Sequence, residues 1–427
     1  MPTTIEQLYK FYQYYPNIQT DSRKIEKGDI YFALRGPNFN GNSFALDALK
    51  KGAAHVVVDE DLGGADSRIF YVEDVLKTLQ ALAKFHRNTF NIPFLAITGS
   101  NGKTTTKELI YAVLNTHIKT YTTEGNLNNH IGIPLTLLKV KRDAEIAVIE
   151  MGANHQKEIE GYCKYTQPTH GLITNCGKAH LEGFGGEEGV RKGKGELYTH
   201  LRIYNGTAFA FNDYDYLHQM IDGVENIVWY GTKNGTVIGD VISSEPFLSV
   251  SFQVNNQFYK VNSQLVGAYN LPNILSAIAI GVHFEVPIEK IINAIEQYSP
   301  SNSRSQLVNW GDNKIILDAY NANPTSMKAA IENFANMNVG PKIIMLGGMM
   351  ELGEESIAEH RAVIQLLKQY TWEKVVLVGG DFRKITHPYT FFDTAVEAKA
   401  WLLQQHYNNA YLLIKGSRSF KMETIIQ

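Results

Sequence analysis

A short glycine-containing segment, "AITGSNGKTTTKEL" at residues 96–109, has the residue types of a phosphate-binding loop. Gly99 and Gly102 have two residues between them, whereas the common P-loop has four between its glycines. A turn here, followed by a helix, would still point backbone N–H groups at one anion. Lys103 would add a positive charge, and Thr104 would offer a hydroxyl to Mg²⁺. The alternative is a strand–turn–helix corner that needs glycine only for tightness, and the Lys-Thr-Thr-Thr run favours the phosphate site.

Further polar residues follow apolar runs later in the chain. Glu150 ends "AVIE", and "NCGKAH" at 175–180 follows another apolar run. We expect "RKGKGE" at 191–196 to start a helix. Ligands gather at the carboxyl ends of parallel strands, and a carboxylate beside a threonine hydroxyl and a triphosphate can hold Mg²⁺. The alternative for Glu150 is a strand-end carboxylate that faces solvent, but its position after an apolar run and before Met-Gly favours the metal role. Taken singly, His180 would more often be a loop histidine and Lys194 a solvated cation.

The elements that must position these residues alternate between short apolar runs and amphipathic stretches, which is typical of α/β proteins. The expected strands are 29–34, 55–60, 94–98, 145–152, 170–175, 314–320, 342–348, 374–380 and 410–416. The expected helices are 43–52, 72–88, a helix from Thr104 onward, 270–284 and 354–370. Residues 205–266 are β-rich, with a hairpin turn at Asn255-Asn256. The glycine cluster 183–189 follows no strand, so we interpret it as a loop.

These elements predict three α/β domains. Residues 1–88 form a small α/β domain, and residues 89–304 form a central P-loop-type domain with a mostly parallel sheet and a β-rich extension. Residues 305–427 form a Rossmann-like domain without a dinucleotide fingerprint.

The composition restricts the class of protein further. The chain has 427 residues, of which 44% are hydrophobic and 19% charged, with a net charge of −3. This balance gives no reason to expect nucleic acid or a membrane as a partner. The two cysteines fit a reducing compartment and exclude a disulfide framework. With no signal peptide or membrane span in the sequence, we expect a cytoplasmic monomer.

Several sequence blocks together resemble the Mur ligase family, the ATP-dependent amide-bond-forming enzymes of bacterial cell-wall synthesis. These blocks are "TGSNGKTTTKE", "TEGNLNNHIGIPLTLL", "EMGANHQKEI", "NCGKAHLEGFGG", "KGKGELY", "DAYNANPTSM", "LGGMMELGEES" and "IKGSRSFKME", which with "TDSRKIEKGDIYFALRG" run in order from about residue 20 to 423. The short glycine spacing of the first block resembles that family's own nucleotide loop. The blocks are similar to the branch that adds D-alanyl-D-alanine to UDP-N-acetylmuramoyl-tripeptide.

The resemblance implies a reaction through an acyl phosphate, with ATP and two Mg²⁺ ions. Thr104 and Glu150 would hold the first ion, and Glu150, His180 and a carbamylated Lys194 would hold the second. Lys192 lies two residues from Lys194, and the "KGE" context favours Lys194. Implied catalytic residues are Lys103, Glu150, His180 and Lys194.

The resemblance also assigns binding residues. Asn273 would lie by the adenine, Arg304 would reach the γ-phosphate and Asp318 would bind the ribose, placing ATP between the second and third domains. On the residues alone, Asn273 could be a helix cap and Arg304 a surface ion pair. The implied loop contacts to ATP are Gly99, Ser100, Asn101, Gly102, Lys103, Thr104 and Thr105. The implied substrate contacts are Ser22, Arg23, Asn126, Asn128, Asn129, Tyr320, Asn321, Asn323 and Arg418, with Lys415 a further candidate.

Two departures from the family pattern concern the substrates. Asn40 and Asn42 replace the titrating groups of an F-D-G-H type sequence, and His130 stands where an aspartate is common, which would place a pH-dependent charge near the peptide.

Other functions fit the sequence less well. The diamino-acid-adding branch usually carries a D-N-P-R stretch in its third domain, which is missing here. Folylpolyglutamate synthetases lack the first domain, and two cysteines cannot build the zinc insert of the lipid-linked amidating relatives. A GTPase switch would need an N-K-x-D stretch, and the presence of Lys103, Thr104, Glu150, His180 and Lys194 argues against an inactive relative.

Overall fold

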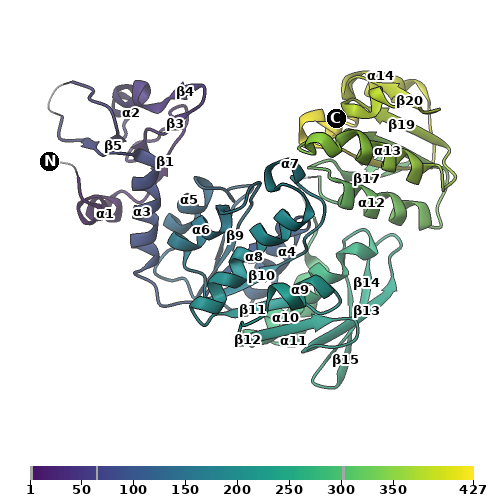
Figure 1. The fold of residues 1–427 in the computed structure, drawn as a ribbon, viewed down its shortest axis with the longest axis horizontal. Coiled ribbons are helices and arrows are strands. Elements are labelled where there is room, and N and C mark those ends of the chain that lie inside the picture. The colour runs from purple at the N-terminus through teal and green to yellow at the C-terminus, as the bar shows by residue number, and fades with distance from the viewer. Residues whose placement is uncertain (1–2, 64–65, 301–302) are drawn as a thin grey trace. The chain divides into compact units, whose positions relative to one another are not determined.

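The computed structural model describes residues 3–63, 66–300 and 303–427 (Figure 1). The chain divides into two compact units. The first comprises residues up to Ala96 together with Lys119–Gly152 and Glu158–His170. The second comprises Ile97–Ile118, Ala153–Lys157 and residues from Gly171 onward. Strand β7 (Phe94–Thr98) crosses this division. The α/β fold class is confirmed.

The first unit contains a parallel sheet in the order β1-β2-β5-β6, and its strands β8 and β9 pair parallel with each other. Its strands are β1 (Ile18–Gln19), β2 (Ile30–Phe32), β3 (Arg35–Gly36), β4 (Phe39–Asn40), β5 (His55–Val58), β6 (Ile69–Tyr71), β8 (Thr120–Thr122) and β9 (Ile146–Glu150). Its helices are α1 (Ile5–Tyr14), α2 (Ala45–Lys51), α3 (Val75–Arg87), α5 (Gly132–Leu138) and α6 (Glu158–Thr166).

Helix α3 illustrates why the expected helices form where they do. The Asp74 carboxylate accepts a hydrogen bond from the backbone N–H of Lys77 at 2.8 Å and so caps the first turn. Val75, Leu79 and Leu82 recur at helical spacing, and all three are buried. The prediction of a helix over 72–88 is therefore confirmed; the helix itself begins at Val75, and Asp74 is its N-cap.

The central part of the second unit is built on strands that lie in the order β15-β14-β13-β12-β11-β10. They are β10 (His170–Ile173), β11 (Thr207–Phe211), β12 (Asn226–Gly231), β13 (Val237–Ser243), β14 (Ser249–Val254) and β15 (Gln257–Asn262). The helices are α4 (Lys103–Leu114), α7 (Leu181–Phe184), α8 (Glu187–Ile203), α9 (Asp215–Met220), α10 (Leu271–His283) and α11 (Ile288–Gln297).

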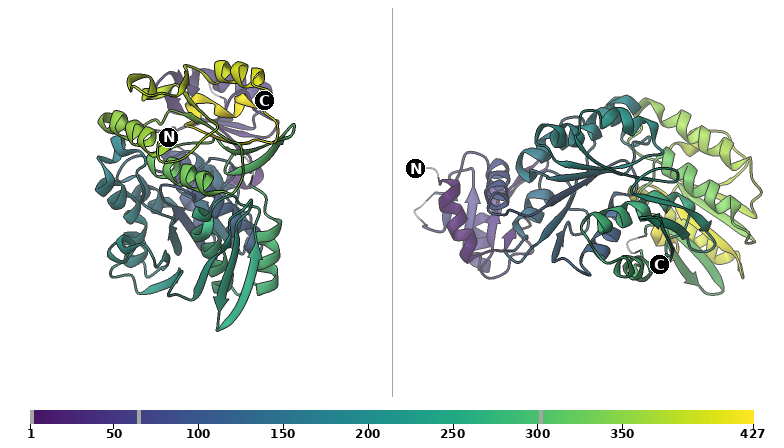
Figure 2. Two further views of the ribbon diagram at one scale, coloured as in Figure 1. Left: turned by 90° about the vertical axis from the view of Figure 1, so that its right-hand side faces the viewer. Right: turned by 90° about the horizontal axis from the view of Figure 1, so that it is seen from below.

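The predicted hairpin in this part is confirmed. Strands β14 and β15 pair antiparallel with Val254 opposite Gln257 (Figure 1, Figure 2). Asn255 and Asn256 between them have φ of 50° and 63°, the left-handed pair that a two-residue hairpin turn requires.

The rest of the second unit, the C-terminal lobe (residues 303–427), has one sheet in the order β16-β17-β21-β18-β19-β20. Its strands are β16 (Gln306–Trp310), β17 (Asn313–Asp318), β18 (Lys342–Gly347), β19 (Lys374–Val378), β20 (Thr390–Phe392) and β21 (Tyr411–Lys415). Its helices are α12 (Pro324–Asn336), α13 (Ser356–Leu367), α14 (Ala395–Gln404) and the 3₁₀ turn η6 (Met422–Ile425).

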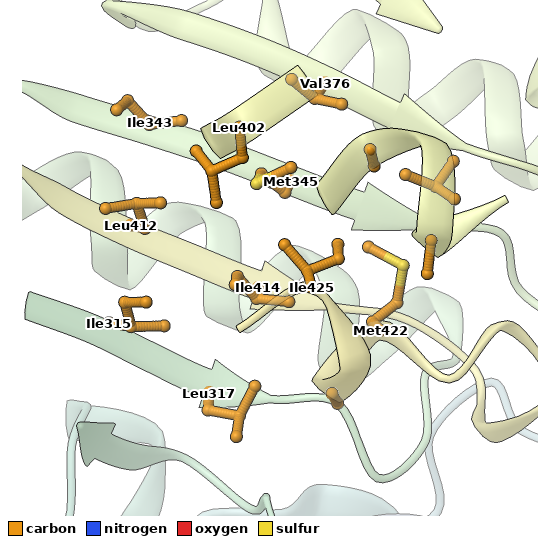
Figure 3. Packing of buried hydrophobic residues seen from close by; sticks show 14 of the residues in the cluster. Ile315, Leu317, Ile343, Met345, Val376, Leu402, Leu412, Ile414, Met422 and Ile425 are labelled. Atoms are coloured by element: carbon orange, nitrogen blue, oxygen red, sulfur yellow. The ribbon is translucent and has the colours of Figure 1, made fainter. Parts of the chain in front are cut away.

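One face of this sheet is covered by α14 and η6. Leu402, Met422 and Ile425 pack there against strand residues such as Ile315 and Ile414 (Figure 3). All of these side chains are almost completely buried, so they fix the carboxyl ends of β17 and β21 relative to each other.

Two predictions about the glycine-rich stretch are wrong. Residues 183–189 are not one loop, since α7 ends at Phe184 and α8 begins at Glu187, and 191–196 lies inside α8. Helix α8 forms despite its glycines because they let it approach the α7 segment closely. A Cβ on Gly189 would lie 1.9 Å from the Phe184 carbonyl oxygen, and one on Gly193 would lie 2.5 Å from the Phe184 ring. Across the described parts of the chain, no helix is both long and apolar enough to cross a membrane.

Candidate functional site

The phosphate loop (Gly99–Gly102) connects the fully buried strand β7 to helix α4. Gly99 has φ of 143°, and a Cβ there would lie 2.0 Å from the Thr174 hydroxyl. Gly102 precedes α4 with φ of 77°, and a Cβ there would lie 2.8 Å from the Asn273 side chain. Both glycines are therefore required by backbone conformation and by close approach. Gly102 has no side chain with which to cap α4, which leaves the helix N-terminus suited to an anion.

The segment after β10 holds the phosphate loop in place. The Ser100 N–H donates to the Asn175 carbonyl at 2.9 Å, and the Asn101 N–H donates to the Asn175 side-chain oxygen at 3.0 Å. The Thr174 hydroxyl donates to the Asn101 carbonyl at 2.6 Å, and the Ser100 hydroxyl donates to the Gly177 carbonyl at 2.9 Å. The loop is thus rigid before any ligand binds. Thr174 and Asn175 were not predicted to support the loop, although both lie at the end of an expected strand.

Two donors near the loop are suited to a phosphate. The Lys103 ammonium folds back over the loop and donates to the carbonyls of Gly99 at 2.7 Å and Ser100 at 3.3 Å. Among the described residues, the buried side-chain nitrogen of Asn101 has no acceptor. Thr104 is buried, and Thr105 is half-buried on the same first turn of α4. A buried donor without an acceptor is rare, and it fits a site that is completed by an anionic ligand.

Asn273 lies against the loop from helix α10. Its side-chain oxygen accepts from the Thr106 hydroxyl at 3.1 Å, and its side-chain nitrogen donates to the Asn270 side chain at 2.8 Å. Asn273 does not cap α10, since it lies within the first turn rather than before it. The helix-cap alternative for this residue is therefore wrong.

Lys194 and Lys192 occupy opposite environments on α8. Lys194 is 1% exposed, its ammonium donates to the Ala153 carbonyl at 3.0 Å, and it lies 4.9 Å from the centre of the Phe184 ring. Lys192 is exposed and pairs with Glu188 on the same helix at 2.8 Å. Burying an ammonium costs free energy, so a lysine kept in this position suggests a chemical role.

His180 precedes α7 with φ of 52°, a left-handed conformation that turns the chain before this short helix. Its Nδ1 atom lies 2.5 Å from a carboxylate oxygen of Glu351 in the C-terminal lobe. The hydrogen bond from His180 lowers the pKa of Glu351. In the same segment, burial raises the pKa of Cys176 to about 12, so this thiol stays protonated and is no nucleophile.

Glu150 ends strand β9 in the first unit and is 1% exposed. Asn128 donates from its side chain to a Glu150 carboxylate oxygen at 2.7 Å, and the Glu150 N–H donates to the Thr123 hydroxyl at 3.0 Å. The neighbouring Asn129 accepts from backbone N–H groups where α5 begins, and the Asn126 carbonyl accepts from the Asn128 N–H. The "GNLNN" block therefore positions this carboxylate.

Asp318 ends β17 and is already hydrogen-bonded within the protein. Its carboxylate accepts from the Lys415 ammonium at 2.5 Å and from the Ser305 N–H at 3.2 Å. Lys415 is 1% exposed and also donates to the Asn321 carbonyl at 3.3 Å. The Ser305 hydroxyl is within 2.9 Å of the Tyr269 hydroxyl. This network anchors the segment that leads into the C-terminal lobe.

Tyr320 brings two arginines together. The guanidinium carbon of Arg304 lies 3.5 Å from the centre of the Tyr320 ring, and that of Arg418 lies 4.9 Å from it. In the part of the chain that the structure describes, the buried Nε of Arg304 has no hydrogen-bond acceptor. The arrangement can receive a further anion.

Asn323, a predicted substrate contact, caps a helix and contacts the phosphate loop. Its side-chain oxygen accepts from the Ser326 N–H at 2.9 Å and caps α12, while its side-chain nitrogen donates to the Asn101 side-chain oxygen at 2.7 Å. The C-terminal lobe therefore contacts the phosphate loop directly.

Ser22 and Arg23 lie on the surface of the first unit. Arg23 is largely exposed, and its guanidinium binds both carboxylate oxygens of Asp21 at 2.8 Å, which lowers the pKa of Asp21. The Ser22 carbonyl accepts from the Lys51 ammonium at 2.9 Å.

The two asparagines that depart from the family pattern, Asn40 and Asn42, form a polar network. Asn40 donates to Glu60 at 3.0 Å, and the buried Asn42 donates to Asp59 at 2.7 Å.

Within residues 3–63, 66–300 and 303–427, no three His, Cys, Asp or Glu side chains form a cluster that could hold a metal ion.

Comparison with known families gives a consistent match along the chain. Residues 15–87 match the description "Mur ligase family, catalytic domain", residues 97–281 match "Mur ligase middle domain", and residues 303–418 match "Mur ligase, glutamate ligase domain".

The chain is also similar to curated relatives over nearly its whole length. It is 33% identical to the UDP-N-acetylmuramoyl-tripeptide--D-alanyl-D-alanine ligases of Bacillus subtilis and Escherichia coli, covering 96% of this chain and 92% of each relative. Among solved structures, MurF from Acinetobacter baumannii superposes with a TM-score of 0.89 at 30% identity, covering 100% of this chain and 98% of that chain. MurF ligase from Thermotoga maritima in complex with ADP superposes with a TM-score of 0.86 at 26% identity, covering 96% of both chains.

Proposed function

The chain belongs to the Mur ligase family, and from this premise we propose that it is an ATP-dependent ligase that joins D-alanyl-D-alanine to UDP-N-acetylmuramoyl-tripeptide. The observation that carries the proposal is the 33% identity to ligases of this name over 96% of the chain. The phosphate loop and the side-chain nitrogen of Asn101, which has no acceptor among the described residues, support nucleotide binding independently. The reaction is one step of peptidoglycan precursor synthesis.

The reaction has two chemical steps. The terminal carboxylate of the tripeptide attacks the γ-phosphorus of ATP, the bond to the β-phosphate oxygen breaks, and ADP leaves. The amine of D-alanyl-D-alanine then attacks the acyl carbon of the acyl phosphate, inorganic phosphate leaves, and the amine loses its proton. ATP is needed because a carboxylate oxygen is a poor leaving group until it is phosphorylated. Negative charge collects where the carboxylate meets the triphosphate, so the site needs donors and cations.

The phosphate loop supplies hydrogen-bond donors and one positive charge. Lys103 exchanges its bonds to the Gly99 and Ser100 carbonyls for bonds to phosphate oxygens, and Asn101 gains an acceptor for its side-chain nitrogen. The N-terminus of α4 adds backbone N–H groups. Because the loop is held by the segment after β10, it pays little ordering entropy when ATP binds.

Mg²⁺ fits the donor types of the candidate residues. Thr104 offers a hydroxyl and Glu150 a carboxylate for one ion, while Glu150, His180 and a carbamylated Lys194 would hold another. Bound there, the ions would neutralise charge on the phosphates. The Lys194 environment fits a carbamate because a neutral amine is easier to bury than an ammonium, and the amine takes up CO₂ to become anionic.

The remaining roles extend the proposal to both substrates. Asn273 is assigned to the adenine, Asp318 to the ribose and Arg304 to the γ-phosphate. Ser22 and Arg23 are assigned to the UDP-sugar. The peptide and dipeptide contacts are assigned to Asn126, Asn128, Asn129, Tyr320, Asn321, Asn323 and Arg418. We further propose domain boundaries at 1–88, 89–304 and 305–427, a monomer, and a cytoplasmic location.

The test is phosphate release from ATP and Mg²⁺ with UDP-N-acetylmuramoyl-tripeptide, measured with and without D-alanyl-D-alanine, together with mass analysis of the product. We expect release that requires both substrates and an amide product of matching mass. Release with a diamino acid and the UDP-dipeptide precursor instead would assign the protein to the neighbouring branch. Lys103→Ala should abolish release while the melting temperature stays unchanged, and a folded Lys103→Ala protein with normal turnover would remove the loop from the reaction.

A further inference from the structure

The C-terminal lobe contacts a short stretch of the central part, residues 177–182, which we call the docking strip. A Cβ on Gly177 would lie 2.7 Å from the Thr325 hydroxyl, so the strip and the first turn of α12 are in close contact. The Lys178 N–H donates to that same hydroxyl at 2.9 Å. At its other end, the Glu182 N–H lies 3.5 Å from the Glu351 carbonyl oxygen.

Lys178 makes an ion pair across this junction. Its ammonium lies 2.7 Å from a carboxylate oxygen of Glu359 on α13 and 3.6 Å from one of Glu187 on α8. The Glu359 side chain is 12% exposed and that of Lys178 42% exposed, so the pair is only partly screened by water. An ion pair of this burial holds its partners more firmly than a fully exposed pair does.

The strip is also fixed to the phosphate loop, because the Ser100 hydroxyl donates to the Gly177 carbonyl at 2.9 Å. Lys178 therefore stands between the loop and helix α13. The same lobe contacts the loop through Asn323 and Asn101 and carries Asp318 at the end of β17.

We propose that Lys178 is a positioning residue that ties α13 of the C-terminal lobe to the docking strip through Glu359, so that the lobe is held against the phosphate loop when the nucleotide binds. Lys178 acts through the lobe and touches no substrate. The inference rests on the proposed function to the extent that the loop binds a nucleotide. When the pair is lost, the lobe is docked in a smaller fraction of molecules, and the apparent nucleotide affinity falls by that fraction.

The test is a double-mutant cycle with Lys178→Met and Glu359→Gln. We expect each single variant to raise the KM for ATP and the dissociation constant for ADP about three- to tenfold, and the double variant to be no worse than either. We expect kcat and the KM for UDP-N-acetylmuramoyl-tripeptide to stay within about twofold of wild type. A general loss of folding would instead change kcat and both KM values together. Wild-type affinity should weaken with added salt more steeply than that of Lys178→Met.

The matched control is Lys192→Met, which removes an exposed ion pair within α8 and should leave every parameter unchanged. Additive effects of Lys178→Met and Glu359→Gln, or ADP affinity unchanged in both single variants, would overturn the proposal. ADP binding by calorimetry separates this inference from the proposed reaction, because it can be measured on a protein that forms no amide. An unchanged melting temperature shows that each variant is folded.

Discussion

Replacement of Lys194 by methionine separates a structural from a chemical role for this buried lysine. Methionine keeps most of the length of the side chain and removes the amine, so it leaves little cavity. In the uncarbamylated protein, the ammonium gains about 1.5–3 kcal/mol from its hydrogen bond to Ala153 and about 1–2 kcal/mol from the Phe184 ring. Against this, burying an ion costs several kcal/mol.

These opposing terms nearly cancel, so the free energy of unfolding of Lys194→Met should lie within about 2 kcal/mol of wild type. Turnover should fall at least ~100-fold, because a methionine cannot form a carbamate, and the loss corresponds to about 2.7 kcal/mol of transition-state stabilisation. Urea unfolding measures the first quantity and phosphate release the second.

Two further measurements identify the chemical species. With ¹³C-bicarbonate, wild type should show a carbamate carbon resonance that Lys194→Met lacks and Lys192→Met retains. In Lys194→Ala, a small added carboxylate should restore part of the activity, whereas bicarbonate should not. Near-normal turnover in Lys194→Met would contradict the chemical role of this lysine. A loss of more than about 4 kcal/mol in unfolding free energy would show that its role is structural.

Three other predictions concern separate parts of the chain. Gly99→Ala should raise the KM for ATP at least ~10-fold, because its Cβ would lie 2.0 Å from the Thr174 hydroxyl. The control is Gly311→Ala, also at positive φ but with no atom within 4 Å of the added Cβ, which should leave that KM unchanged. Burial lowers the pKa of His360 in the folded protein. Below about pH 6.5 the unfolded chain therefore binds a proton that the folded chain does not, and the free energy of unfolding decreases as the pH is lowered, down to the lowered pKa. Urea unfolding at pH 7.5 and 5.5 should show a smaller loss for His360→Gln than for wild type. Asn256→Val should lower the free energy of unfolding by about 1–2 kcal/mol with the KM for ATP unchanged, because a β-branched residue is strained at φ of 63°.

Elements with a strong local signal were predictable. Strand β7 is a continuous apolar run, α3 has helical periodicity, and Asn255-Asn256 has the residue types of its hairpin turn. Strands β16 and β20 were not predicted as strands. Both lie at edges of their sheet, where burial is partial and the apolar pattern is weak. Helix α8 was misplaced because its glycines disfavour a helix locally, and its packing against Phe184 outweighs that preference.

Candidate site residues could be proposed from the sequence where one local motif contains them, as for the phosphate loop, and their roles stay predictions. Partners that come from distant segments were not found. The pair of His180 with Glu351 and that of Lys178 with Glu359 each join positions more than 170 residues apart, and no local pattern encodes such pairs. For the same reason the sequence could not show that Asp318 is held by Lys415.

The contact between His180 and Glu351 has a thermodynamic consequence. A carboxylate that accepts the Nδ1 proton of a histidine fixes the ring and makes Nε2 a better ligand, and here that carboxylate belongs to the C-terminal lobe. If His180 holds a cation, lobe docking and cation affinity are linked functions. By reciprocity, the factor by which docking tightens the cation is the factor by which the cation favours docking. The measured affinity for Mg²⁺ would then depend on whether the C-terminal lobe is docked, although no residue of that lobe is a proposed ligand of the ion.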